Sequence, residues 1–381
     1  MLDQRLVGQL EARRLVLTLG RQHREAANES PLSIRINRNV LLIGPAGTGK
    51  TCIPQGVCDA LGLPLAIVDA AGFGTSRIQG RPLDEIFGEM LQAAGNKLSQ
   101  AEKGVLLLEN LDHLLRLVPE AGRDLQQAWV QLMNGRSRMV ATTRGTQVLA
   151  SSGWWIIGSG TFEGLGLAAA RRQNQHTIGF QVGDPKSALP RATAADLIAL
   201  GMLPALVARL PFICELHPFK PDDLLAISCL DHSAVGQWVL AFRRAGVSLE
   251  LTEDARRDLA RQAEALKLGA HGLQAVLGSR LGHLIARLPE FRGRTQRVVV
   301  DLGAMLGESA PKIIAGPPLF PLPDEAELKH DSETEDWPPD LQELFPPGVV
   351  PARPARIRQS SSGNDRLATL ADLRPFLEAK P

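Results

Sequence analysis

The chain has 381 residues, of which 44% are hydrophobic and 22% are charged, and its formal net charge is +1. This length is sufficient for two or three domains with buried cores. A nearly neutral chain argues against nucleic-acid binding driven by bulk charge. Aromatic residues make up 4% with no tyrosine, which leaves little for stacking on bases. We therefore expect no nucleic-acid partner.

Several features favour a cytoplasmic location. No apolar run approaches the roughly 18 residues of a membrane span, so we expect no membrane partner. The first residues, Met1 to Arg5, carry charge where a signal peptide would need an apolar stretch. The four cysteines form no C-x-x-C pair, which favours reduced core or near-core thiols over a disulfide or zinc framework: Cys52, Cys58, Cys214 and Cys229.

The first half of the chain alternates predicted helices with short apolar strands. The helices are expected at 3–28, 52–62, 82–94 and 124–133, and the strands at 40–43, 65–69, 105–108 and 154–158. Uninterrupted apolar strands are typical of a sheet that is covered on both faces. The alternation predicts an α/β fold with a doubly wound parallel sheet.

The pattern changes near residue 213, where helical periodicity dominates. Helices are expected near 221–229, 233–245, 252–266 and 271–288, followed by a strand at 297–301. The segment after residue 314 is rich in proline and polar residues and cannot bury enough apolar surface to fold. We predict a large α/β domain, a smaller helical domain and a disordered tail, with the boundaries 1–212, 213–314 and 315–381.

One motif stands between the first strand and the helix that follows it. Its sequence is G-x-x-x-x-G-K-T, formed by Gly44, Pro45, Ala46, Gly47, Thr48, Gly49, Lys50 and Thr51. Glycines let backbone N–H groups close around phosphate oxygens, while the lysine lies beside the β- and γ-phosphates and the threonine hydroxyl binds Mg²⁺. The alternative is a glycine-rich turn that matches by chance. The strand before and the helix after favour a nucleoside triphosphate site.

Five ordered motifs together resemble the ClpX family of AAA+ unfoldases over residues 2–314. They are an opening segment Leu2-Asp3 and Val7-Gly8-Gln9, the glycine motif above, a sensor-1 segment Gly158–Leu165, an arginine segment Asp196–Pro211, and Gly269-Ala270-His271-Gly272-Leu273 at the sensor-2 position. The zinc-binding domain that opens ClpX proteins has no counterpart in this sequence, which we expect to begin directly with the ATPase module.

The resemblance implies an AAA+ fold that binds ATP and Mg²⁺ in a homo-oligomer, with a hexameric ring expected. The nucleotide contacts that it implies include Val7, the glycine motif with Cys52, Thr161 and His271. The catalytic residues would be Lys50, Glu109, Asn110 and Arg209, and the metal ligands Thr51 and Glu109. Arg209 would reach the γ-phosphate of a neighbouring subunit. The alternative for Arg209 is a surface or interdomain ion pair.

Two loops imply protein partners. Ile178, Gly179 and Phe180 lie in a polar stretch and resemble the loop that docks on the ClpP peptidase, since exposed apolar residues on a loop favour a partner. The alternative is a local anchor that folds the loop onto its own domain. Arg77, Ile78, Gln79 and Gly80 align with the pore loop that grips protein substrates. Ile78 stands where the family has an aromatic ring, so the grip is expected to be weaker.

The Walker B strand, Leu106 to Asn110, departs from the family because it should end in Asp-Glu. Glu109 can still hold Mg²⁺, but the amide of Asn110 cannot accept a proton from the attacking water at neutral pH. Losing a general base costs roughly 10²–10⁴-fold in rate. Asp112 is a conceivable substitute. However, a strand that continued to Asp112 would place it about 7 Å beyond Asn110, too far for the same water unless the backbone turns sharply.

The sensor-2 position also departs, because His271 replaces an arginine and cannot supply a permanent cationic fork. An ordinary interdomain residue is the alternative there, and Arg280 is nearly opposite His271 on the expected helix.

Two hypotheses follow. One is an ATP-driven protein unfoldase that works with a ClpP-type peptidase. The other is a hydrolysis-impaired nucleotide-binding scaffold or regulator of a Clp-type ring. A nucleic-acid remodelling ATPase is less favoured than either.

Overall fold

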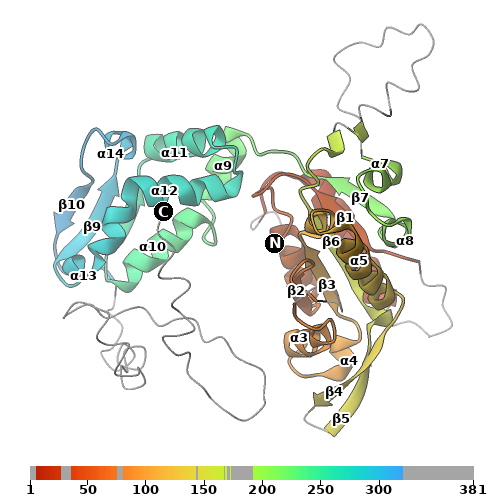
Figure 1. The fold of residues 1–381 in the computed structure, drawn as a ribbon. Helices are drawn as coiled ribbons and strands as arrows, with labels where there is room; N and C mark the ends of the chain where they lie inside the picture. The colour runs from red at the N-terminus through yellow and green to blue at the C-terminus, as the bar shows by residue number, and fades with distance from the viewer. Residues whose placement is uncertain are drawn as a thin grey trace, which may run out of the picture. The chain divides into compact units, whose positions relative to one another are not determined.

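The computed structural model describes residues 6–26, 36–74, 80–142, 145–166, 168–169, 172 and 192–320. At its centre is a five-stranded sheet with the strand order β2-β3-β6-β1-β7 (Figure 1). Every neighbouring pair in this sheet is parallel. The strands are β1 (Val40–Ile43), β2 (Leu65–Asp69), β3 (Val105–Glu109), β6 (Trp155–Gly160) and β7 (Phe212–Glu215).

Alternate residues of the central strands enter two separate hydrophobic cores. In β1, Leu41 and Ile43 belong to one core, and Val40 and Leu42 to the other. The side chains of a strand point to opposite faces in turn, so helices must cover both faces. The helices of this region are α1 (Leu10–Ala26), α2 (Cys52–Leu61), α3 (Glu85–Ala93), α4 (Leu98–Ala101), α5 (Pro119–Met133), α7 (Ala194–Ala199) and α8 (Pro204–Val207), with 3₁₀ turns η2 (Leu111–Leu115) and η3 (Ser151–Gly153).

Helices α1 and α2 contribute Val16 and Val57 to one core, whereas α3 and α5 contribute Phe87 and Trp129 to the other. The doubly wound parallel sheet predicted from the sequence is confirmed. The predicted strands were each found within two residues at either end. However, β7 was not predicted; it pairs with β1 on the side away from β6.

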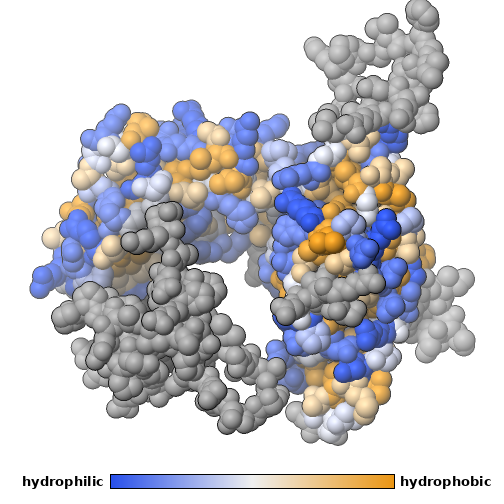
Figure 2. Space-filling view, in the orientation of Figure 1, coloured by the Kyte–Doolittle hydropathy of each residue, from blue (hydrophilic) through white to orange (hydrophobic). Residues whose placement is uncertain are grey.

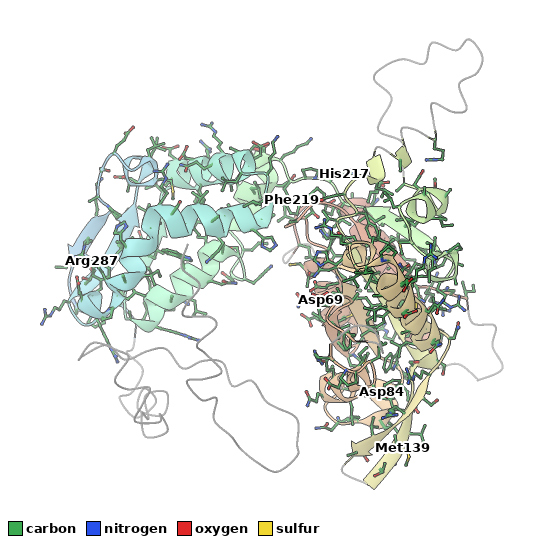
Figure 3. All side chains as sticks on the ribbon, in the orientation of Figure 1. Asp69, Asp84, Met139, His217, Phe219 and Arg287 are labelled. Atoms are coloured by element: carbon green, nitrogen blue, oxygen red, sulfur yellow. The ribbon has the colours of Figure 1, made fainter. Side chains whose placement is uncertain are left out.

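An antiparallel hairpin, β4 (Ser137–Thr142) and β5 (Gly145–Ala150), lies outside this sheet and was not predicted. Its base forms ion pairs with Asp84, from Arg136 at 3.4 Å and from Arg138 at 3.1 Å. Met139 and Val148 face each other across the hairpin and are 66% and 55% exposed. Figure 2 shows apolar residues at the surface there, and Figure 3 labels Asp84 and Met139 at that end.

Residues 219–320 build a third hydrophobic core, which includes Leu224, Phe242, Leu259 and Leu277. Its elements are α9 (Pro221–Ser228), α10 (Ala234–Arg244), β8 (Ser248–Leu251), α11 (Glu253–Ala265), α12 (Ala270–Ala286), α13 (Leu288–Phe291), β9 (Thr295–Val300), α14 (Leu302–Leu306) and β10 (Lys312–Ala315). The four helices expected here are present, and the expected strand is β9. Strands β8 and β10, which flank β9, were not predicted.

Two predicted domain boundaries fall inside strands. The boundary at 212/213 cuts β7, which belongs to the central sheet, and the boundary at 314/315 cuts β10. Described structure continues to Phe320, whose ring lies 4.7 Å from the Arg243 guanidinium. The division into domains stays a prediction, and the tail predicted to be disordered lies outside the described residues from 321 onward.

Two further expectations concern the membrane and the cysteines. None of the helices in the described part of the chain has the length and apolar character needed to cross a bilayer. All four cysteines are free thiols, but only Cys58 and Cys214 are buried. The expectation of core or near-core thiols is wrong for Cys52 and Cys229, which are exposed because each lies at the start or the end of a helix.

Candidate nucleotide site

The glycine motif forms a tight loop between β1 and α2. Gly47 and Gly49 have φ of +68° and +97°, a region that residues with a side chain rarely adopt. A Cβ on Gly44 would approach the Leu216 carbonyl oxygen to 2.6 Å. The Gly44 N–H donates to the Gly160 carbonyl at 3.2 Å, which fixes the start of the loop to the end of β6. The backbone therefore needs glycine at these positions.

Within the loop, the Thr48 hydroxyl is buried and donates to the Pro45 carbonyl at 2.8 Å. Lys50 lies half-buried, and its ammonium donates to the carbonyls of Gly44 and Pro45, each at 2.6 Å. Burial lowers the pKa of Lys50, while the negative charges of Asp112 and Glu109 raise it. A partly desolvated cation enclosed by a glycine loop at a helix N-terminus is suited to a polyanion.

The two predicted metal ligands lie together. Thr51 precedes α2, Glu109 ends β3, and the Thr51 hydroxyl donates to the Glu109 carboxylate in a short hydrogen bond. The strands that carry them are separated by β6, so their meeting depends on the sheet order. A hydroxyl and a carboxylate are hard oxygen ligands, the type that Mg²⁺ takes beside phosphate oxygens and water. These residues fit Mg²⁺, which would orient the phosphates when bound.

The chain after Glu109 does not continue as a strand. Asn110 has the left-handed conformation φ 56°, ψ 39°, and η2 begins at the next residue. The distance of about 7 Å expected for Asp112 held only for a strand that continued, and this condition is not met, because the backbone turns sharply at Asn110. Asp112 is instead buried, and it accepts the N–H of Thr161 at 3.2 Å. This brings the predicted sensor-1 residue into contact with a carboxylate.

Two predicted nucleotide contacts, Val7 and His271, come from parts of the chain that are far from the glycine loop in sequence. Half-buried Val7 is followed by Gln9, which exchanges hydrogen bonds with the backbone of His217, directly after Leu216. At the start of α12, the Ala270 N–H donates to the Gly47 carbonyl at 2.9 Å. His271 is exposed, and its Cδ2 is 3.1 Å from the position that a Cβ on Gly47 would take.

The helix position of Arg280 explains why it does not replace His271 at the loop. Its guanidinium donates to Gln262 and to the Leu306 carbonyl, both at 3.4 Å. These contacts are exposed and link α12 to α11 and α14. Ala270 and His271 are thus the residues of α12 seen to adjoin the glycine loop, while Arg280 forms its contacts elsewhere.

Arg209 lies at the other end of the sheet. It donates to the Asn134 side chain and to the Ala205 carbonyl, and it lines a cavity of about 640 Å³ together with Asn39 and Trp155. Asn39 precedes β1, whereas the glycine loop follows it. A strand of four residues spans about 13 Å. Arg209 is therefore not brought together with Lys50 within one chain.

Two predicted loop sites lie largely outside the described residues: Arg77, Ile78 and Gln79 of the pore loop, and Ile178, Gly179 and Phe180 of the docking loop. Of the former, Gly80 is described and exposed. Its neighbour Arg81 accepts from the Gly74 N–H at 2.9 Å and donates its own N–H to Gly72 at 3.2 Å. These bonds join the two ends of the segment 75–79.

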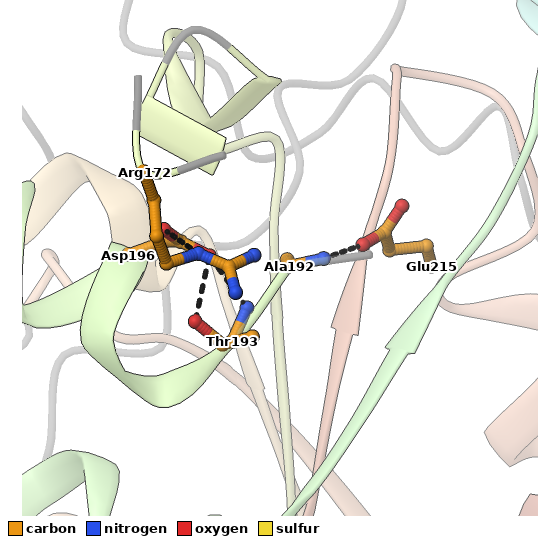
Figure 4. A network of polar contacts seen from close by, with 5 residues as sticks. All are labelled: Arg172, Ala192, Thr193, Asp196 and Glu215. Atoms are coloured by element: carbon orange, nitrogen blue, oxygen red, sulfur yellow. Dashed lines mark hydrogen bonds and ion pairs between the residues drawn. The ribbon is translucent and has the colours of Figure 1, made fainter. Parts of the chain in front are cut away.

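A polar network joins the residues on either side of 173–191 (Figure 4). Asp196 accepts from the Thr193 hydroxyl and N–H at 2.7 and 2.8 Å, forming a capping box at α7, and from Arg172 at 3.0 Å. The Ala192 N–H donates to Glu215 at the end of β7. Burial raises the pKa of Asp196, but the Thr193 hydrogen bonds and Arg172 together lower it below its usual value.

The comparisons with known proteins agree with this geometry. A model of the ATPase family associated with various cellular activities (AAA) matches residues 40–160. The ATP-dependent Clp protease ATP-binding subunit ClpX 2 of Wolinella succinogenes is 27% identical over 330 residues, covering 82% of both chains. Subunits named ClpX are 26% identical over 324 residues in Porphyromonas gingivalis (79% of this chain, 78% of the relative) and 25% over 336 in Treponema denticola (82% and 80%).

Sequence reasoning missed two features of the site. It did not place Asp112 against Thr161, although asparagine is one of the few residues that adopt the left-handed turn and Asn110 was a signal for it. It also missed the Arg172–Asp196–Thr193 network. The threonine followed three residues later by an acidic residue was a capping-box pattern that could have been found.

Proposed function

We propose that this chain, a ClpX-like AAA+ protein, binds Mg²⁺ and ATP at the glycine loop and uses the nucleotide to unfold or remodel proteins as a subunit of a ring. The contact between the Thr51 hydroxyl and Glu109 carries this proposal. It joins the end of β1 to the end of β3 beside Lys50, in the arrangement that a Mg²⁺–triphosphate requires. Gly44, Gly47 and Gly49 supply the backbone cradle.

The position of Arg209 supports the proposed ring. A cation at the opposite end of β1 cannot stabilise the γ-phosphate of its own site, but it is available to an adjoining subunit. The described contacts of the Arg209 side chain are with Asn134 and the Ala205 carbonyl. Neither partner carries a charge, so neither neutralises the guanidinium. We infer a homo-oligomer, with six copies as the expected number.

Mixing two inactive variants tests the shared site. We expect Lys50→Ala and Arg209→Ala each to turn over ATP very slowly when alone, because each lacks one half of the site. Mixed rings contain junctions with an intact Lys50 beside an intact Arg209, so turnover should recover. Wild-type turnover by Arg209→Ala alone, or no recovery in mixtures that form rings, would contradict a shared site.

The protein partner that we propose is a ClpP-type peptidase. The relatives are named as ATP-binding subunits of the ATP-dependent Clp protease. Arg172 and Thr193, which flank the segment carrying Ile178, Gly179 and Phe180, are both held by Asp196. A loop whose base is fixed in this way suits docking, since less ordering entropy is lost on binding.

A pull-down with a ClpP-type peptidase, comparing wild type with Phe180→Ala, separates docking from a local anchor. We expect Phe180→Ala to lose binding. Ile198→Ala is the matched control, because Ile198 is an exposed apolar residue on the neighbouring helix α7. Equal capture of wild type and Phe180→Ala would remove the docking assignment.

A hydrolysis-impaired scaffold or regulator is the second candidate, and Asn110 favours it, because an amide stands where a proton acceptor is needed. Bound ATP that persists unchanged in the purified wild type would favour this candidate over the first. The cytoplasmic location and the absence of a nucleic-acid partner stay predictions.

A further inference from the structure

The turn after β3 brings a second carboxylate, that of Asp112, close to the nucleotide loop, where its charge acts on Lys50 together with that of Glu109. Glu109 is the last residue of the strand, and the left-handed Asn110 reverses the chain into η2. Asparagine tolerates this conformation better than glutamate does. The turn therefore accounts for the asparagine and at the same time moves Asp112 off the line of β3 and against the end of β6.

Asp112 is fixed in this position by β6. Its Oδ1 accepts the Thr161 N–H at 3.2 Å, and a Cβ on Gly160 would approach the same oxygen to 2.6 Å. Only glycine at 160 leaves room for the carboxylate. The carbonyl of Gly160 in turn accepts the N–H of Gly44, the first residue of the glycine loop. One residue of β6 thus separates Asp112 from the loop.

The second oxygen of Asp112 is unsatisfied. Asp112 is 5% exposed, and its Oδ2 is buried and has no hydrogen-bond partner among the residues that the structure describes. A buried carboxylate oxygen without a partner is costly and calls for an explanation, of which a catalytic role is one. Asp112 also acts on Lys50, since its negative charge raises the pKa of the ammonium more strongly than that of Glu109 does.

We propose that Asp112 is the carboxylate that accepts the proton of the attacking water, in place of the side chain missing at Asn110. This inference rests on the proposed ATP site. The water oxygen forms a bond to the γ-phosphorus, and the bond from that phosphorus to its bridging oxygen breaks, with the electron pair leaving on ADP. The water proton passes to Asp112, which releases it after phosphate leaves.

Asp112→Asn tests this role, because an amide oxygen still accepts the Thr161 N–H but does not accept the proton. We expect ATP turnover to fall on the order of 100-fold or more. The affinity for ATP should be unchanged or higher, because a negative charge near the phosphates is lost. The nucleotide recovered from the protein after incubation should be ATP in this variant and ADP in the wild type.

Asp69→Asn is the matched control. Asp69 ends the neighbouring strand β2, is exposed, and also accepts a backbone N–H, that of Ala71 at 3.0 Å. It should keep wild-type turnover. If Asp112→Asn binds ATP and hydrolyses it at the wild-type rate, Asp112 only supports Thr161 and the inference is overturned, while the ATP site stands.

Asn110→Glu provides a second measurement that needs no change at Asp112. With Asp112 active in the wild type, adding the usual glutamate should raise turnover by less than about tenfold, whereas a site without a base should gain roughly 10²–10⁴-fold. A gain in that larger range overturns the inference even if Asp112→Asn does not fold. The inference is also overturned if the wild-type protein binds ATP but does not hydrolyse it. No binding of ATP by wild type removes the proposed function first.

Discussion

The ends of β1 and β3 lie two strands apart in one sheet. The motifs that follow these two strands match those of the ClpX family to different degrees. After β1, every residue of the glycine motif is kept, and the glycines have conformations or neighbours that exclude a side chain. After β3, Asn110 replaces the expected carboxylate, and a buried Asp112 lies nearby. The contrast suggests a division within the proposed site: phosphate binding would depend on the shape of the backbone, whereas proton acceptance would depend on the position of a carboxylate.

The largest effect is expected at the end of β1. Lys50→Ala removes the half-buried cation that the loop encloses. Charge-assisted hydrogen bonds to phosphate contribute about 1.5–3 kcal/mol each, so ATP affinity should fall at least tenfold and turnover should disappear. Titration calorimetry and a phosphate-release assay measure both. If Lys50→Ala kept its affinity for ATP, the loop after β1 would not be the site that binds the phosphates.

Glu109→Gln tests whether a metal ion joins the end of β3 to the loop that follows β1. The Thr51 hydroxyl would keep an acceptor at this position, but the charge that attracts Mg²⁺ would be lost. We expect ATP affinity in the presence of Mg²⁺ to fall on the order of tenfold, with little change in its absence. The same loss with and without Mg²⁺ would assign Glu109 a structural role.

Gly47→Ala tests the backbone requirement itself. With φ of +68° and the Leu268 carbonyl oxygen 2.3 Å from the new Cβ, we expect a loss of about 1–3 kcal/mol in unfolding free energy, measured by denaturant titration. Gly88→Ala is the control, because Gly88 lies within α3 with nothing within 4 Å of its Cβ position. That change should stabilise the protein by about 0.5–1 kcal/mol. Equal effects would refute the steric explanation.

The smallest effect concerns Cys52, which follows Thr51. Although the residue is exposed, partial desolvation of its thiol raises the pKa, and the Glu109 carboxylate raises it further. Only the thiolate reacts with alkylating agents, so Glu109→Gln should lower the pKa and speed alkylation of Cys52 at pH 8 by roughly twofold. Exposed Cys229 is the internal control and should react at an unchanged rate. A slower reaction at Cys52 would contradict the electrostatic link between the two strand ends.

The sequence predicted the β1 end well because its signal is local. A strand, a glycine-rich turn and a helix are contiguous, and their spacing alone specifies the loop. The central strands were also predictable, because β1, β3 and β6 are buried throughout. The doubly wound sheet followed from their alternation with helices.

The β3 end was not predictable because it depends on contacts between distant residues. Asp112 meets Thr161 across 49 positions of sequence, and only the left-handed turn at Asn110 makes that possible. Strand β7 was missed for a similar reason, since its four residues gain their strand character from pairing with β1. The location of Arg209 opposite the glycine loop likewise required the sheet order.

Titration calorimetry of the wild-type chain with ATP, in the presence and absence of Mg²⁺, tests the central claim most directly. We predict saturable heat that corresponds to one site per chain and an affinity that increases when Mg²⁺ is present. The absence of any heat of binding with Mg²⁺ and ATP, from protein whose melting shows it to be folded, would contradict the account.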